Sequence, residues 1–338
     1  MLKRFWRAQE NNQIMNKVIF VPYADIKGAS YGLNTNKGER PREIYFKNVC
    51  VSLFSAKYYN PDADVALVTN IDLPEEYDSF LRLNSVKIIK APFEKFKFDD
   101  QYPWCLAFYK LCALEFMVRN TKYDFFSYID SDVYVQANFN GIWKECKYSA
   151  LLYDLNNGFC EDFYEEFIST INDFTGKDEN ITHYGGEFFA ANRANAEFFA
   201  DKCEKIFEQL IDEKIIMTYG DEFIVTIAAS QMKERIKNSG SYVFRCFIKP
   251  FSGVKMYYPV NNSLTVLHLP FQKETGMIKL YDRYIKKGKL PKRKTLYKIL
   301  KISHSPFKAS LDELVILPEK IYKKTKMVLK GLLLKKGN

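Results

Sequence analysis

Asp130 and Asp132, two aspartates one residue apart, carry the clearest chemical potential in this 338-residue chain. They follow the apolar run 124–129, which is typical of a β-strand, so both carboxylates lie where a strand ends. Hard divalent cations prefer such oxygen ligands, and a bound cation neutralises a diphosphate. The spacing alone also fits a solvated turn. The apolar strand before the pair favours a metal site.

The elements around this pair alternate between strands and helices. Predicted strands occupy 17–23, 64–69, 86–90, 124–129 with a continuation at 133–135, 150–153, 242–250 and 264–269. Predicted helices occupy 43–59, 103–118, 137–146, 194–213, a stretch from about 220 and the region after 279, and a polar loop is expected up to about 182. This alternation of strands and helices predicts an α/β fold with a mainly parallel sheet. In such folds ligands bind beyond the carboxyl ends of the strands.

The segment 128–135, Tyr-Ile-Asp-Ser-Asp-Val-Tyr-Val, resembles the Asp-x-Asp strand of glycosyltransferases with the GT-A fold. The resemblance implies that Asp130 and Asp132 hold Mn²⁺ or Mg²⁺ on the diphosphate of a nucleotide sugar, with a UDP-sugar favoured. The upstream helix around 104–110 is similar to a helix of that class whose basic residue faces the donor, which implies this role for Lys110. A lysine on a helix is otherwise an ordinary solvated residue.

Two later motifs resemble the retaining transferases of the blood-group ABO type, in the same order along the chain. Tyr-Gly-Gly-Glu-Phe-Phe-Ala at 184–190 implies a donor pocket lined by Gly185, Gly186 and Glu187, because glycines let a backbone approach a sugar closely. Glu187 stands where that pattern has a small residue, so the donor sugar stays open.

The second of these motifs, Tyr-Gly-Asp-Glu at 219–222, resembles a His-Asp-Glu triplet whose glutamate lies under the anomeric carbon. The resemblance implies that Asp221 and Glu222 are catalytic. Gly220 replaces the histidine, so its contact is not carried over. Acidic residues in a first helical turn are also ordinary partners of the helix N-terminus.

Two positions resemble other parts of GT-A enzymes. His268 matches the late histidine that completes the metal site in enzymes of the glycogenin and lipopolysaccharide-glucosyltransferase kind, and Lys273 matches the lysine after it, one residue closer than in their pattern. A structural histidine is the alternative. The region after the first strand corresponds to the base pocket, where Tyr23 is expected to stack on the base and Asp25 to accept a hydrogen bond from it.

The resemblance therefore implies metal-dependent transfer of a hexose to a glycan acceptor in surface polysaccharide or lipopolysaccharide synthesis. With retention, Glu222 is nucleophile or electrostatic stabiliser; with inversion, Asp221 or Glu222 deprotonates the acceptor hydroxyl. Collinearity with the ABO-type motifs favours retention. Two other classes stay open, namely a nucleotidyltransferase and a non-catalytic membrane-surface adaptor with vestigial acids.

Composition limits the remaining classes. A hydrophobic share of 47% supports a proper core, and the seven cysteines lack any zinc-binding spacing, which predicts reduced thiols in a cytoplasmic protein. No apolar run approaches the roughly 18 residues of a membrane-spanning helix. Acceptor and donor are thus expected to meet the protein in the cytoplasm.

The basic residues gather at the C-terminal end. Residues 279–338 hold 18 Lys and Arg against 4 acidic residues, whereas 1–278 hold 32 against 37. We therefore expect a GT-A domain at 1–278 and a basic amphipathic helical tail at 279–338. Alternating lysine-rich and apolar stretches favour peripheral binding of the tail to an anionic membrane, and the acidic body argues against nucleic acid.

Overall fold

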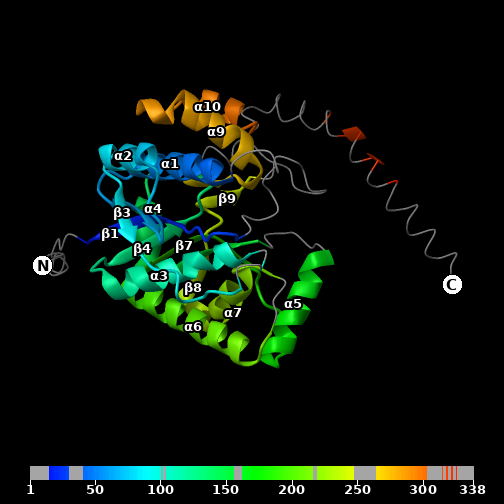
Figure 1. The fold of residues 1–338 in the computed structure, drawn as a ribbon. Helices are drawn as coiled ribbons and strands as arrows, with labels where there is room; N and C mark the ends of the chain where they lie inside the picture. The colour runs from blue at the N-terminus through cyan, green and yellow to red at the C-terminus, as the bar shows by residue number, and fades with distance from the viewer. Residues whose placement is uncertain are drawn as a thin grey trace, which may run out of the picture.

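The computed structural model describes residues 15–29, 41–99, 102, 104–155, 162–215, 219–246 and 264–302, with single residues at 314, 317, 318, 321, 322 and 325. A seven-stranded sheet lies between two layers of helices (Figure 1). Its strands, in spatial order, are β3 (Lys87–Lys90), β2 (Asp64–Thr69), β1 (Lys17–Tyr23), β4 (Phe125–Ile129), β7 (Tyr184–Asn192), β6 (Ala150–Asp154) and β8 (Ile236–Asn238). The predicted α/β fold with a mainly parallel sheet is confirmed.

The direction of β7 decides where the functional residues meet. β7 runs antiparallel to β4 and β6, while the other neighbours in this sheet are parallel. The beginning of β7 therefore lies beside the end of β4, with Phe188 opposite Ile129 in the register. This arrangement brings the Gly-Gly-Glu motif next to the Asp-x-Asp motif, which lies 55 residues earlier in the chain.

A second sheet, of three strands, begins just after β4 in the chain. β5 (Val133–Val135) pairs antiparallel with β10 (Val266–His268), and β10 pairs parallel with β9 (Val243–Arg245). The prediction had 133–135 as a continuation of the preceding strand. β5 instead belongs to a different sheet, because the chain turns at 130–132 between two buried strands.

Side chains alternate between the two faces of the main sheet, as strand geometry requires. In β1, Ile19 and Val21 join the core on one face, whereas Val18 and Phe20 join the core on the other. The first face is covered by α1 (Pro41–Tyr59), α2 (Glu75–Leu83), α4 (Asn140–Cys146), α9 (Ile278–Arg283) and α10 (Arg293–Ile299). The second is covered by α3 (Tyr109–Asn120), α5 (Asp162–Thr175), α6 (Arg193–Asp212) and α7 (Glu222–Met232) (Figure 1).

The prediction of a polar loop up to about 182 is wrong for its middle part. Residues 162–175 form α5, which buries Phe167 and Ile171 in the core beneath the sheet. The apolar residues of this helix recur at helical spacing among acidic and polar residues, so its overall polarity concealed an amphipathic pattern. Smaller differences are the 3-10 turn at Cys105–Phe108 that precedes α3 and the short strand β8.

The first part of the expected tail packs into the body. Residues 280–302 bury apolar side chains in the same core as α1, namely Leu280, Tyr281, Ile285, Leu296, Tyr297, Leu300 and Ile302. Most of 303–338 lies outside the described residues, so the membrane-binding prediction concerns mainly that part. The six cysteines that the structure describes are buried and form no disulfide. Among the described helices, none is both long and apolar enough to cross a bilayer.

Candidate functional site

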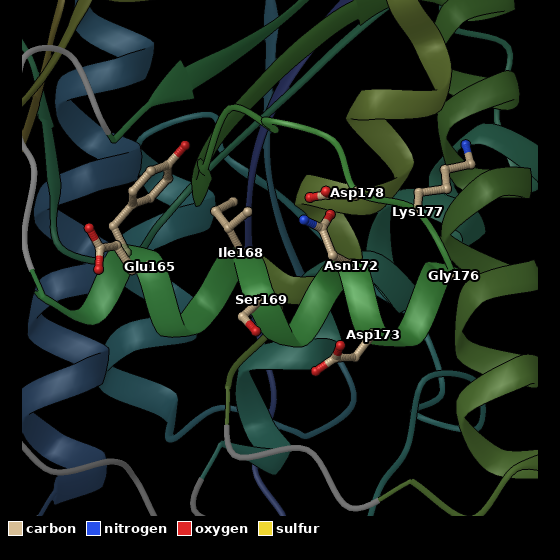
Figure 2. A pocket seen from close by; sticks show the side chains of 9 residues that line it. Glu165, Ile168, Ser169, Asn172, Asp173, Gly176, Lys177 and Asp178 are labelled. Carbon is tan, nitrogen blue, oxygen red and sulfur yellow. The ribbon is translucent and has the colours of Figure 1, made fainter.

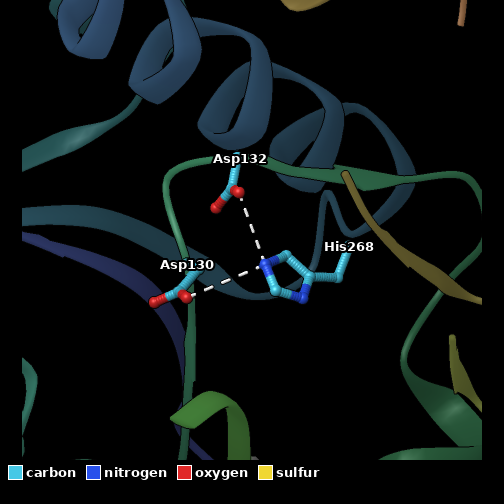
Figure 3. Close-up of side chains that lie close together, drawn as sticks. All are labelled: Asp130, Asp132 and His268. Carbon is cyan, nitrogen blue, oxygen red and sulfur yellow. Dashed lines mark ion pairs between the residues drawn. The ribbon is translucent and has the colours of Figure 1, made fainter. Parts of the chain in front are cut away.

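Two carboxylates and an imidazole converge at the edge where the two sheets meet. Asp130 and Asp132 follow β4, and His268 ends β10, whose register places it opposite Val133, the neighbour of Asp132. His268 Nε2 lies 3.9 Å from Asp130 Oδ2 and 3.4 Å from Asp132 Oδ2 (Figure 3). The three ligand atoms lie within 4.8 Å of one another, so the residues predicted to bind a metal are brought together.

The donor set fits a divalent cation. Asp132 is 1% exposed, yet its Oδ2 atom has no hydrogen-bond partner in the described structure. Its nearest cationic atoms, Lys273 Nζ and His268 Nε2, lie 3.3 Å and 3.4 Å away, so a metal ion bound there would add the closer contact that this oxygen lacks. Two carboxylates with one imidazole suit Mn²⁺ or Mg²⁺ better than softer metals that prefer thiolates.

Lys273 lies at the same cluster, with its Nζ atom 3.3 Å from Asp132 Oδ2. Burial raises the pKa of Asp132, but Lys273 and His268 lower it more, so the carboxyl pKa is far below its usual range. Burial lowers the pKa of His268, whereas Asp132 and Glu187 raise it, to about 9. Without a cation, the positive charges of Lys273 and His268 therefore offset the buried carboxylates.

Lys110 on α3 connects this cluster to the second pair of acids. Its Nζ atom lies 3.1 Å from Asp130 Oδ1 and 3.0 Å from Asp221 Oδ2, and it donates a hydrogen bond to the carbonyl of Gly186. Burial lowers the pKa of Lys110, but Asp130 and Asp221 hold it well above its ordinary value. Lys110 is thus a fixed positive charge between two acidic groups.

Gly185 and Gly186 lie within β7, where side chains of the site occupy the space beside them. A Cβ atom on Gly185 would lie 1.9 Å from Glu187 Oε2, and one on Gly186 would lie 1.9 Å from Asp221 Oδ2. Both distances are far shorter than any real contact, so a larger residue at either position would require one of these carboxylates to move. The observed reason for the glycines is the close approach of the protein's own carboxylates, whereas contact with a sugar stays a prediction.

Asp221 and Glu222 open α7 and face different surroundings. A hydrogen bond from the amide of Tyr184 in β7 to Thr226 Oγ1 holds α7 against the sheet. Glu222 is paired through both oxygens: Oε1 lies 3.1 Å from Arg245 Nη2, and Oε2 lies 3.2 Å from His183 Nε2. The acidic pair therefore sits next to the metal-ligand cluster, linked to it by Lys110 and Arg245.

The pKa values of these two acids move apart. Burial raises the pKa of Asp221 to about 6 despite the opposing effect of Lys110. Burial also raises that of Glu222, but Arg245 and His183 lower it more, to about 2. Such divergence within one site is how a protein gives two carboxyl groups different roles.

Three residues of the site were not predicted: Arg245, His183 and Tyr45. Arg245 interrupts the apolar run 242–248, and a lone charge in such a run is a signal that could have identified it. His183 immediately precedes the predicted Tyr-Gly-Gly motif, and its ring stacks on Phe167 with centroids 4.0 Å apart. Tyr45 on α1 has its ring 5.6 Å from Lys273 Nζ, and nothing in the sequence pointed to it.

Tyr23 and Asp25, the predicted base-binding residues, lie at the end of β1. The ring of Tyr23 packs against Phe46 and Tyr45, with centroid distances of 5.4 Å and 6.1 Å, and the residue is 5% exposed. Asp25 forms an ion pair with Arg42. Residues 30–40 lie outside the described part of the chain, so stacking by Tyr23 and hydrogen bonding by Asp25 stay predictions.

A separate hollow lies along α5 (Figure 2). It measures about 740 Å³, and its lining comes from the helix and the residues directly after it, 164–178. None of the predicted site residues belongs to this lining. The hollow is therefore distinct from the cluster of acids and imidazoles.

Comparisons with known proteins give distant similarities. No family model matches the chain, and no curated protein matches its sequence. The galactosyltransferase LgtC in complex with donor and acceptor sugar analogs is similar over 74% of this chain and 86% of that chain, with 14% identity and a TM-score of 0.46. An active-site mutant of LgtC is similar over the same shares, with 15% identity and a TM-score of 0.45. Similarity at this level assigns no chemistry to the residues described above.

Proposed function

We propose that the chain is a GT-A glycosyltransferase that transfers a hexose from a nucleotide sugar, a UDP-sugar by preference, to a glycan acceptor. The acceptor class is a surface polysaccharide or a lipopolysaccharide, and the reaction retains the anomeric configuration. The observation that carries the proposal is the cluster of Asp130, Asp132 and His268 at the carboxyl end of β4. Ligands of α/β proteins bind at such strand ends.

The charges around the cluster suit a diphosphate leaving group. Asp130, Asp132 and His268 would hold a divalent cation, which when bound neutralises negative charge on the diphosphate. Lys110 and Lys273 are partly buried cations directly beside these ligands. Fixed positive charges at the place where negative charge develops stabilise a transition state without reorganisation.

Glu222 is suited to stabilise positive charge rather than to accept a proton. Its pKa of about 2 keeps it ionised at neutral pH and makes it a weak base, because Arg245 and His183 stabilise the anion. An anion held in place beside the sugar fits the retaining role, as stabiliser or nucleophile. In the inverting alternative, Asp221 is the better base, since its pKa of about 6 is close to neutral pH.

The decisive experiment is a panel of nucleotide sugars incubated with the full-length protein and Mn²⁺, with and without a chelator. We expect hydrolysis or transfer with one donor, lost on chelation. Activity with nucleoside triphosphates and sugar phosphates instead would identify a nucleotidyltransferase, and no turnover with tight membrane binding would identify an adaptor. NMR of the product settles the stereochemistry: an α-linked product from an α-linked donor is expected, and a β-linked one would assign inversion.

We also propose that the end of the chain binds an anionic membrane from the cytoplasmic side. Four of the single residues described there are exposed apolar side chains in helical backbone, namely Leu314, Leu317, Ile321 and Tyr322. Residues 320–336 contain 7 lysines and no acidic residue. Apolar contacts with flanking lysines suit the headgroup region, where each basic residue contributes about 1 kcal/mol.

A further inference from the structure

The glutamate that departs from the expected motif contacts the imidazole of the metal-ligand cluster. Glu187 is 1% exposed, and its Oε1 atom lies 3.2 Å from His268 Nδ1. The other ring nitrogen, Nε2, faces Asp130 and Asp132 (Figure 3). The strand register explains the meeting, because Glu187 lies at the start of β7 beside Asp130, whose amide donates to the Glu187 carbonyl.

Arg245 contacts both Glu187 and His268. The pairing of β9 with β10 places it directly opposite His268. Its Nε atom lies 3.2 Å from Glu187 Oε1 and 3.2 Å from His268 Nδ1, and its Nη2 atom lies 3.1 Å from Glu222 Oε1. A carboxylate as deeply buried as Glu187 needs a paired charge, and Arg245 supplies it.

The two contacts to Nδ1 favour opposite tautomers of His268. A carboxylate only accepts hydrogen bonds, so Glu187 stabilises a ring with its proton on Nδ1. The Arg245 Nε–H only donates, so it fits a ring whose Nδ1 is bare and whose proton is on Nε2. A cation binds the ring through the lone pair of Nε2, and this requires the proton on Nδ1. When Nδ1 carries that proton, Arg245 can still donate to Glu187 and Glu222.

We propose that Glu187 is a positioning residue that presents the bare Nε2 of His268 to a divalent cation, and that Arg245 holds the Glu187 carboxylate in place for this purpose. The inference rests on the proposed function, because it needs a cation between Asp130, Asp132 and His268. A carboxylate behind a metal-binding histidine fixes the ring and its tautomer, and its loss typically weakens metal affinity about 10- to 100-fold.

The first test measures binding of Mn²⁺ alone to the full-length protein, by electron paramagnetic resonance of the free ion. Glu187→Gln keeps the size of the side chain and removes its charge, and we expect the Kd for Mn²⁺ to rise about 10- to 100-fold. Glu115→Gln is the matched control, since Glu115 is also a largely buried, ion-paired carboxylate but contacts Lys95 instead. An unchanged Kd in Glu187→Gln overturns the proposal.

A second test separates positioning from simple charge balance. If Glu187 merely offsets the charge of Arg245, the double variant Glu187→Gln/Arg245→Gln regains the native Mn²⁺ affinity, and this result overturns the proposal. If Glu187 acts through His268, the Mn²⁺ affinity of the double variant stays low. In a His268→Ala background, Glu187→Gln should then cause no further loss, because the group it positions is gone.

A third test needs no variant. Nitrogen-15 NMR of the native protein with Mg²⁺ reports the tautomer of each histidine, and the chain has only three. We expect His268 to carry its proton on Nδ1; a proton on Nε2 in the Mg²⁺-loaded protein overturns the proposal.

The two proposals fail in different ways. Native protein that binds no Mn²⁺ refutes the metal site and this inference together. Protein that binds Mn²⁺ with the expected tautomer but uses no nucleotide sugar refutes only the proposed function.

Discussion

Two carboxylates of the site, those of Asp132 and Glu222, differ in how their oxygens are hydrogen-bonded. Asp132 Oδ2 has no hydrogen bond within the described structure, and it lies between the cations Lys273 and His268. Glu222 has each of its oxygens held by a separate partner, Arg245 and His183. A carboxylate oxygen that has ion pairs but no hydrogen bond can still take a ligand, whereas hydrogen bonds to both oxygens keep the charge of Glu222 in a fixed place.

This difference indicates which acids suit metal binding and which suits electrostatic stabilisation. In the proposed function, Asp130 and Asp132 would provide ligand atoms, so their effect on turnover should depend on the metal. Glu222 would provide a fixed negative charge, so replacing it should affect the chemical step. Asp221 differs from both Asp132 and Glu222. For Asp221 the effect of burial exceeds that of its charged partner, so its pKa is raised, to about 6.

The largest effect is expected when the charges of Asp130 and Asp132 are removed. The double variant Asp130→Asn/Asp132→Asn should lose Mn²⁺-dependent turnover by at least ~10²-fold, because the cation that offsets the diphosphate charge is no longer held. Steady-state assays across a range of Mn²⁺ concentrations measure this. Asp72→Asn, a surface carboxylate paired with Lys90, is the control. Metal-dependent turnover that survives in the double variant contradicts the assignment.

Next in size is the loss of the fixed charge. Glu222→Gln should lower kcat by about 10²-fold and change the donor KM little, since the proposed function places this carboxylate where positive charge appears only in the transition state. Initial rates at varied donor concentration separate the two constants. A variant with native kcat and a raised KM would move Glu222 from catalysis to binding.

A smaller effect concerns stability, and its sign differs between the two neighbours. Asp221 has a raised pKa, so the unfolded chain loses its proton first and native stability falls as pH rises from about 4 to 6. Raising the pKa of the Asp221 carboxyl from 3.8 to about 6 corresponds to about 3 kcal/mol. Asp221→Asn should therefore raise the melting temperature by a few degrees at pH 7 and little at pH 4.

Glu222 is expected to behave in the opposite way. Its pKa is lowered to about 2, so its contribution to stability is present at neutral pH and is lost as pH falls from about 4.5 to 2. Glu222→Gln should thus lower the melting temperature at pH 7, and the deficit should shrink on acidification. Thermal unfolding of both variants at pH 4 and 7 makes the comparison; changes of the same sign would show that the two carboxyl groups share one environment.

The smallest effect lies outside the site. Full-length protein should co-sediment with phosphatidylserine-containing vesicles at low salt and detach as salt rises, because screening weakens the lysine contacts. A variant that ends after Ile302 should stay in the supernatant and keep its turnover of soluble donors. A cut at 279 is unsuitable, since it would remove buried side chains such as Leu280 and Tyr281. Equal vesicle binding by the two proteins would show that residues after 302 are not responsible for membrane binding.

Much of the framework could be predicted from the sequence. The bounds of β1 and β2 matched, because both are short apolar runs between polar segments. The convergence of Asp130, Asp132 and His268 also followed from the family resemblance and is observed. By contrast, α5 was missed because its apolar residues are scattered among acidic ones.

The partners of the acids could not be predicted, for a physical reason. Arg245 reaches Glu187 and Glu222 only because β9 pairs with β10 in one particular register. Such a register is fixed by the packing of the whole sheet and leaves little trace in the local residue pattern. Motifs therefore identified the acids, while three-dimensional pairing determined which charges hold them.

The packing of α9 against α1 and α2 has a consequence for synthesis of the chain. Tyr281 lies 5.9 Å from the ring of Tyr77, and its hydroxyl lies 3.2 Å from Glu76 Oε1, a residue 205 positions earlier. A ribosome that adds 5–20 residues per second needs roughly 10 to 40 s to produce that intervening stretch. Throughout that time the side chains that contact Tyr281, such as Tyr77 and Phe80, lack this part of their native packing. The face of α2 that packs on α9 is therefore completed only after residue 281 has been made.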